Sequence, residues 1–227
     1  MSETEGKFMK NRRQSNNSKS VGIVLLAVSI VYTLLIKLID VAGIGPMASE
    51  GGFSTINAFF AERIGFSNLW YKITTYLGYL AILVVLFFAI CGIIQLVKRK
   101  SLLKVDRGIL VMGIMFVVLL AIYIIFNKVA INYRPIILPG ETVLESSYPS
   151  SHTMIAVCVF GATIIEFKHR LGESSTYSII KWVMIALMVI SVIGRLLSGA
   201  HWFTDIVGGV LISATLISFF AASSEEY

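Results

Sequence analysis

Residues 109–126 read ILVMGIMFVVLLAIYIIF, an uncharged run of 18 residues. An α-helix rises 1.5 Å per residue, so a run of about this length crosses the hydrocarbon core of a bilayer. The composition agrees, because 56% of the 227 residues are hydrophobic and 14% are charged. A soluble domain carries about 25% charged residues. The run therefore predicts a membrane span, and the composition predicts a membrane protein.

Five further apolar runs lie on either side of it, and we expect spans at 21–39, 69–97, 152–167, 178–196 and 205–222. The first is too long for the core of a signal peptide, so we expect it to stay in the protein. The predicted fold class is all-α, a bundle of six transmembrane helices. We expect a basic tail at 1–20, the six-helix domain at 21–222 and a short C-terminal tail at 223–227.

Orientation follows from the lysines and arginines of the short connections. They gather in residues 1–20, 98–107 and 168–170, which share one side of the membrane if there are six spans. We expect that side, with both termini, to be the cytoplasm, in a multi-pass protein of the cell membrane. The net charge of +6 is then a topology signal, so we expect no nucleic-acid partner.

The outer segment 40–68 begins with glycines, and then Phe53, Ile56, Phe60 and Ile64 recur at helical spacing. This pattern predicts a short amphipathic helix. The helix lies either in the outer membrane interface or as a cap on the bundle.

Polar side chains, which are costly in a membrane, occur in three stretches at the predicted outer ends of the spans. The first stretch holds Lys128 and Arg134, followed by Pro135. An arginine clamps phosphate oxygens in a bidentate manner and a lysine acts on them as a point charge. The alternative is that both side chains snorkel to lipid headgroups.

The second stretch, at the start of the fourth predicted span, reads Pro149-Ser150-Ser151-His152. Pro149 suits the first turn of a helix, and either serine can cap it. The free N–H groups of that turn would point at an anion. A plain helix cap is the alternative interpretation.

The third stretch runs from Arg195 through His201 to Asp205, and Gly199 permits a tight turn within it. If the last helix begins near His201, Asp205 lies one turn along on the same face. An acid there holds one imidazole nitrogen protonated and leaves the other free to attack, although a purely structural pair fits as well. Two of the chain's three histidines, His152 and His201, are thus predicted on the outer face, where they can act together on a phosphate.

The three stretches resemble the ordered motifs of the type 2 phosphatidic acid phosphatase family, the membrane branch of a superfamily that includes vanadium haloperoxidases. The family motifs are Lys-x6-Arg-Pro, Pro-Ser-Gly-His and Ser-Arg-x5-His-x3-Asp. The chain departs from them at three places. Lys128 is one residue too close to Arg134, with Asn127 in the expected position, Ser151 replaces the glycine, and Gly194 replaces the serine.

The resemblance implies a lipid phosphate phosphatase with its active site at the outer membrane face. His201 would be the nucleophile that forms a phosphohistidine, and Asp205 would orient it. His152 would protonate the leaving alcohol and then activate water. The phosphate would be held by Arg134, Arg195, Ser150, Ser151 and Lys128.

No cluster of carboxylates for a metal pair is visible in the sequence, so we expect catalysis without a metal or another cofactor. The expected partners are the bilayer and a lipid phosphate. Phosphatidic acid, phosphatidylglycerol phosphate and polyprenyl pyrophosphate all fit, and the sequence leaves both this choice and the oligomeric state open. The alternatives are a lipid phosphotransferase with the same intermediate and a lipid-phosphate binding protein with a degenerate site.

Overall fold

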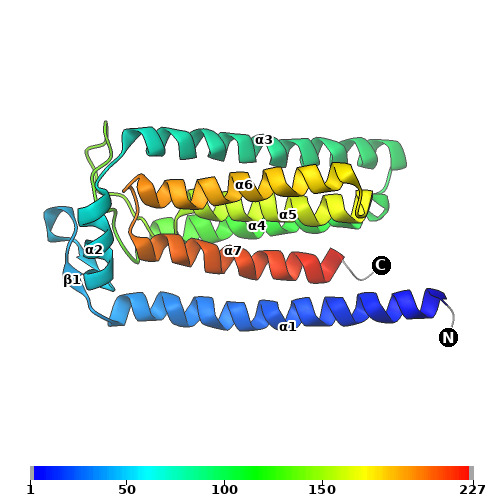
Figure 1. Ribbon diagram of the computed structural model, residues 1–227, viewed down its shortest axis with the longest axis horizontal. Coiled ribbons are helices and arrows are strands. Elements are labelled where there is room, and N and C mark those ends of the chain that lie inside the picture. Colours follow the sequence, from blue (N-terminus) through cyan, green and yellow to red (C-terminus); the bar gives the residue numbers. More distant parts are fainter. Residues whose placement is uncertain (1–2, 225–227) are drawn as a thin grey trace.

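The computed structural model describes residues 3–224, which form a bundle of long, roughly parallel helices (Figure 1). Within these residues the α-helices are α1 (Glu3–Leu38), α2 (Ser54–Ile64), α3 (Asn68–Arg99), α4 (Arg107–Lys128), α5 (Ser151–Leu171), α6 (Ser175–Leu197) and α7 (Phe203–Ser224). The smaller elements are the strands β1 (Ala42–Gly43) and β2 (Glu50–Gly51) and the 3-10 turns η1 (Pro46–Ala48) and η2 (Leu102–Lys104).

Five of the six predicted spans fall within one long helix each, and the first, 21–39, extends one residue past the end of α1 at Leu38. Five helices of the described residues, α1, α3, α4, α6 and α7, are long and apolar enough to cross a membrane. The fold is therefore that of a multi-pass membrane protein. Helix α5, which holds the fourth predicted span, is not among the five. It packs against α3, α4, α6 and α7, and nearly all of its residues from Thr153 to Thr163 are buried.

The predicted boundary between the basic tail and the first span is not a break in the structure. Helix α1 already begins at Glu3 and continues through that boundary without interruption. It packs along α7, and the Ser15 hydroxyl donates a hydrogen bond to the Ala222 carbonyl at 2.9 Å. Of the predicted C-terminal tail, residues 225–227 lie outside the described part of the chain.

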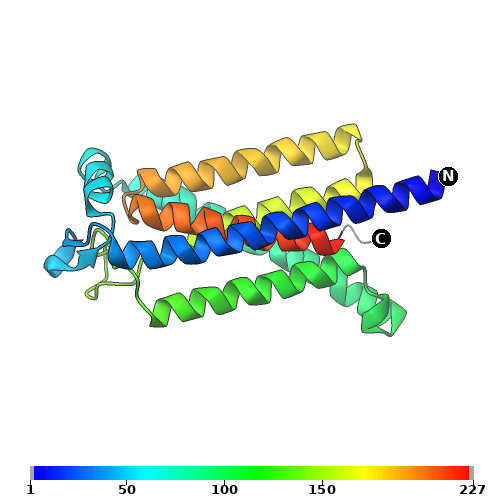
Figure 2. The same cartoon turned by 90° about the horizontal axis from the view of Figure 1, so that it is seen from below.

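The two ends of the bundle differ in character. The start of α1, the end of α7, and the α3–α4 and α5–α6 connections lie at one end, whereas α2 and β1 lie at the other (Figures 1 and 2). At the first end Asp106 accepts hydrogen bonds from Arg99 at 2.7 Å, Gln95 at 2.7 Å and Arg170 at 3.1 Å. The hydrogen bond from Arg99 is the main reason that the pKa of Asp106 lies below its usual range. This cluster joins α3, α4 and α5.

Helix α2 packs onto the start of α7, which favours the second interpretation of this segment, a cap on the bundle. Its Asn57 side chain is buried and donates to the Thr204 hydroxyl at 2.9 Å. The ring of Phe60 stacks on that of Phe203 with centroids 4.5 Å apart. Contacts of this kind with the last helix anchor α2 beside the α6–α7 turn.

Glycines in α7 bring the start of α5 close to this turn. A Cβ atom at Gly208 would collide with the ring of Tyr148, and one at Gly209 would lie 3.1 Å from the Ser150 carbonyl oxygen. Small residues of this kind allow close approach of backbones in a membrane. The Tyr148–His152 segment therefore rests directly on α7.

Candidate active site

The loop between α4 and α5 forms a short antiparallel ladder that positions the first stretch of polar residues. Tyr133 and Ser146 form an isolated β-bridge. On one side of it the Arg134 N–H donates to the Glu145 carbonyl at 3.0 Å, and on the other the Ser147 N–H donates to the Asn132 carbonyl at 2.9 Å. The ladder thus holds Arg134 beside Glu145.

His201 lies in the α6–α7 turn, almost fully buried, between two groups that select its protonation. Arg134 Nη1 donates to His201 Nε2 at 3.1 Å, and His201 Nδ1 donates to the Ser147 carbonyl at 3.0 Å. A guanidinium can only donate and a carbonyl can only accept. Both partners therefore require the neutral tautomer with the proton on Nδ1 and a lone pair on Nε2.

The electrostatic surroundings favour the same state. Burial, reinforced by the positive charges of Arg134 and Arg195, holds the pKa of His201 well below its usual value. A neutral imidazole keeps a lone pair on Nε2 and can act as a nucleophile once the hydrogen bond from Arg134 is released to a phosphate oxygen, whereas an imidazolium cannot. The protonation state is therefore compatible with the nucleophilic role that the resemblance implies for His201.

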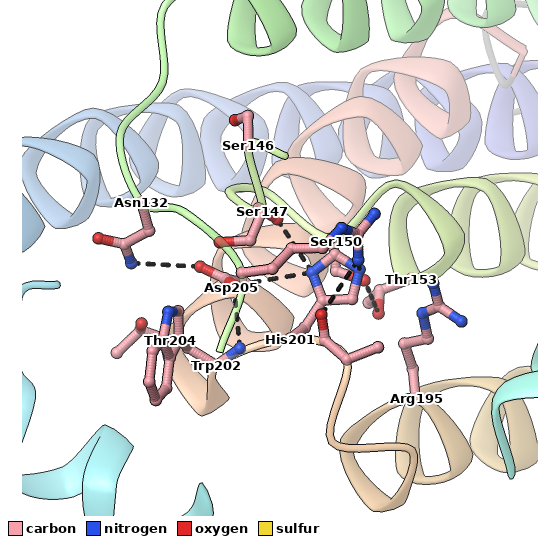
Figure 3. Close-up of polar contacts among 12 residues, drawn as sticks. Asn132, Ser146, Ser147, Ser150, Thr153, Arg195, His201, Trp202, Thr204 and Asp205 are labelled. Atoms are coloured by element: carbon pink, nitrogen blue, oxygen red, sulfur yellow. Dashed lines mark hydrogen bonds and ion pairs between the residues drawn. The ribbon is translucent and has the colours of Figure 1, made fainter. Parts of the chain in front are cut away.

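Asp205 lies beside the His201 ring, on its Nδ1 side, and accepts hydrogen bonds that hold the turn in place (Figure 3). Its Oδ2 is 3.6 Å from His201 Nδ1 and accepts from the Trp202 N–H at 3.0 Å. Its Oδ1 accepts from the Asn132 side chain at 3.2 Å. The predicted proximity of His201 and Asp205 is present, although α7 begins at Phe203 and the closest acceptor for Nδ1 is the Ser147 carbonyl.

The second stretch starts α5 in a different way from the prediction. The helix begins at Ser151 with Ser150 as its N-cap residue, so Pro149 lies before the first turn. The Ser150 side chain does not cap the helix, because its hydroxyl accepts from the Thr153 hydroxyl at 3.0 Å. Instead the Ser150 N–H donates to the Asp205 carbonyl at 3.1 Å, which ties α5 to α7.

A polar cavity of about 500 Å³ opens at this end of the bundle and unites the stretches. Its walls include five of the eight predicted site residues, namely Lys128, Arg134, Ser151, His152 and His201. The Lys128 side chain is exposed. It lies on this cavity despite its shifted spacing, and Asn127 does so too.

The other three predicted residues, Ser150, Arg195 and Asp205, are fully buried and do not line this cavity. Arg195 Nη1 donates to the Thr74 hydroxyl at 3.1 Å, and the guanidinium lies over the ring of Tyr71. Its Nε and Nη2 atoms are buried without a hydrogen-bond partner in the structure. Unpaired buried donors of a cation are costly and suit the oxygens of an anion.

Several residues of the site were not identified from the sequence. Asn132 lies inside the first stretch, and a polar side chain two residues before Arg134 was the available signal. Thr74, in the second predicted span, could have been noticed as a hydroxyl within an apolar run. Ser147 acts on His201 through its backbone carbonyl. Gly78 leaves room for His152 through its missing side chain, since a Cβ at Gly78 would lie 3.2 Å from the His152 ring. Such roles leave no side-chain signal.

The structure also explains the departure at Gly194. A Cβ at this position would lie 2.9 Å from Thr74 and from the ring of Trp70. Helix α3 therefore approaches α6 closely here, and Thr74 provides a hydroxyl beside Arg195 from the neighbouring helix.

Comparisons with known proteins agree with the motifs. Residues 134–226 match the family model of the PAP2 superfamily. The whole fold is similar to the crystal structure of a transmembrane PAP2-type phosphatidylglycerolphosphate phosphatase from Bacillus subtilis, with a TM-score of 0.61 and 19% sequence identity, covering 89% of this chain and 94% of that one. No curated protein sequence gives a significant match. The matched region holds the second and third stretches and the Arg134 end of the first, so the comparisons support the resemblance of these motifs to the type 2 phosphatidic acid phosphatase family.

Proposed function

We propose that the protein is an integral membrane phosphatase that removes phosphate from a lipid monoester or pyrophosphate through a phosphohistidine on His201. The observation that carries this proposal is the pair of hydrogen-bond partners of His201, which selects its tautomer. Its Nε2 lone pair faces the polar cavity's arginine, Arg134, while its Nδ1 proton is held by the Ser147 carbonyl. An arginine beside a nucleophile is well placed to hold the phosphate that is attacked.

In the first step Nε2 of His201 forms a bond to phosphorus and the bond from phosphorus to the leaving oxygen breaks. Arg134, with Lys128 and Arg195, stabilises the negative charge spread over the other phosphate oxygens. Asp205 favours the positive charge that develops on the His201 ring, 3.6 Å away.

His152 is the proposed general acid, and its place between two cavities supports that role. It lines the polar cavity and also an apolar one of about 360 Å³ between α3, α4 and α5. The leaving oxygen joins the phosphate to the lipid, so it has to lie where a polar and an apolar space meet. A bound phosphate dianion favours the protonated form of a nearby imidazole, which can then donate its proton to that oxygen.

In the second step neutral His152 accepts a proton from water, the water oxygen attacks phosphorus and the N–P bond breaks. Inorganic phosphate leaves and both histidines return to their starting states. The step requires no metal, and we propose that the reaction is metal-independent. A lipid hydroxyl in place of water would make the protein a phosphotransferase, which analysis of the products separates from hydrolysis.

The apolar cavity also supports a lipid substrate, because its walls would hold a hydrocarbon tail while the phosphate enters the polar space. The similar Bacillus subtilis protein is described as a phosphatidylglycerolphosphate phosphatase. Phosphatidylglycerol phosphate, phosphatidic acid and polyprenyl pyrophosphate are therefore the first candidates. The site would face away from the cytoplasm, at the end of the bundle opposite the basic segments.

The test is phosphate release by the purified protein in detergent from a panel of these lipids. We expect activity that persists in excess chelator and is abolished in His201→Ala, with the thermal unfolding of the variant unchanged to within a few degrees. An isotopically labelled phosphate retained on the wild-type protein after acid-free quenching would identify the intermediate. Turnover in His201→Ala, or a strict requirement for added magnesium, would contradict the proposal.

A further inference from the structure

Among the described residues that line the polar cavity, Glu145 is the acidic one. Its Oε2 accepts from Arg134 Nε at 2.9 Å, and its side chain is 46% exposed. Arg134 Nη1 in turn lies 3.1 Å from the nucleophilic Nε2 of His201. The carboxylate is thus separated from the attacking atom by a single guanidinium group.

The backbone keeps the carboxylate in this place. Glu145 and Arg134 are neighbours across the short ladder, where the Arg134 N–H donates to the Glu145 carbonyl at 3.0 Å. Opposite charges in such cross-strand positions stabilise each other. Glu145 therefore remains beside the phosphate position as long as the ladder that positions Arg134 is intact.

The charges around the cavity match a phosphate dianion. Lys128 and Arg134 contribute two positive charges to its walls and Glu145 removes one, while Arg195 is buried nearby with unpaired donors. A phosphomonoester carries a charge of about −1.5 to −2 near neutral pH. A diphosphate carries at least one further negative charge, and that charge has to enter the same cavity because the attacked phosphorus lies at His201.

We propose that Glu145 is a specificity-determining residue that makes the site prefer monophosphates over diphosphates of a lipid. The inference rests on the proposed phosphatase function. Repulsion between the carboxylate and the second phosphate group raises the barrier for diphosphates, whereas a monophosphate leaves the Glu145–Arg134 pair undisturbed. Selectivity of this kind depends on a repulsive element as well as an attractive one.

A role limited to positioning Arg134 is the competing explanation, and Glu145→Gln separates the two. The amide oxygen of glutamine still accepts a hydrogen bond from Arg134 Nε but carries no charge. A positioning role would affect both substrates alike, because both need Arg134. A charge role changes the ratio of the two.

The experiment measures kcat/KM for farnesyl monophosphate and farnesyl diphosphate, which share one tail. We expect the wild-type protein to prefer the monophosphate. In Glu145→Gln the ratio should move toward the diphosphate by about tenfold, the size expected for one unit charge a few ångströms away in a half-exposed cavity. Glu145→Asp, which keeps the charge, and Glu141→Gln, which removes a charge from the same loop away from the cavity, should keep the wild-type ratio.

A wild-type preference for the diphosphate, or an unchanged ratio in Glu145→Gln, would overturn the inference. If the variants at 145 fail to fold, Lys128→Gln provides the opposite test, because removal of a cation should shift the ratio further toward the monophosphate. No shift in that variant would also count against the charge explanation. Absence of turnover by wild-type protein on every lipid of the panel would instead defeat the proposed function itself.

Discussion

At the scale of single residues, the chemistry of the site depends on what surrounds the ring of His201. The motif spacing placed Asp205 near this histidine, and the structure adds that the Ser147 carbonyl at 3.0 Å is the nearer partner of Nδ1. Asp205 accepts from Asn132 and Trp202 as well. Asp205 therefore holds the α4–α5 loop, the α6–α7 turn and α7 together. Its negative charge also favours a positive charge on the His201 ring.

The two cations of the first stretch are not equivalent, and mutation should show it. Arg134 contacts His201, the proposed nucleophile, and is largely buried, whereas the Lys128 side chain lies exposed at the cavity. Arg134→Ala should lower kcat by about 10²- to 10³-fold, the loss typical of a donor that stabilises transition-state charge. Lys128→Ala should cost about tenfold or less, because a solvent-exposed charge is screened.

Both values come from steady-state phosphate release with the same lipid, and unfolding temperatures serve as the control for folding. Equal and complete loss in the two variants would restore Lys128 to the centre of the clamp.

At the scale of elements, contacts between helices decide whether these residues meet. The Tyr148 ring fits against Gly208 of α7, its hydroxyl lies 2.7 Å from that of Thr33 in α1, and its ring packs edge-on against Phe126 of α4. Tyr148 follows Ser147, whose carbonyl orients His201. The packing of three helices thus reaches His201, the proposed nucleophile, through one residue.

A side chain at Gly208 should therefore reduce activity without unfolding the protein. Gly208→Ala would push the Tyr148 ring away and displace the Ser147 carbonyl, and a shift of about 1 Å at a catalytic group can cost about 10²-fold in rate. We expect at least a tenfold loss of kcat in phosphate release. The matched control is Gly113→Ala in α4, where an added Cβ meets no atom within 4 Å. Wild-type kcat in Gly208→Ala would show that Tyr148 does not transmit this packing.

At the scale of the whole molecule, the six long helices of the described residues are even in number. The start of α1 and the end of α7 therefore lie at the same end of the bundle (Figure 1). The basic segment 98–107 and the Asp106 cluster lie at that end, and the polar cavity lies at the other. Positive charge is retained on the cytoplasmic side of membranes. The cavity should then open to the outside.

Labelling with a membrane-impermeant maleimide tests this orientation. In a Cys91→Ser background, with Cys158 fully buried, Thr142→Cys in the α4–α5 loop should react in intact cells. Lys100→Cys, between α3 and α4, should react only after permeabilisation. The reverse pattern would place the cavity on the cytoplasmic side.

The sequence by itself determined the long helices, the three polar stretches and the two histidines that line the cavity, because hydropathy and motif spacing are local properties of the chain. The structure favoured one interpretation of α2 and corrected the start of α5 and the position of Pro149. The tertiary structure alone decided the partners of those histidines. The Ser147 carbonyl is a backbone group, Gly78 makes room by its missing side chain, Thr74 offers a hydroxyl from a neighbouring helix and Glu145 pairs with Arg134 across a loop ladder. Their roles exist only once segments far apart in the sequence pack together, so no local pattern records them.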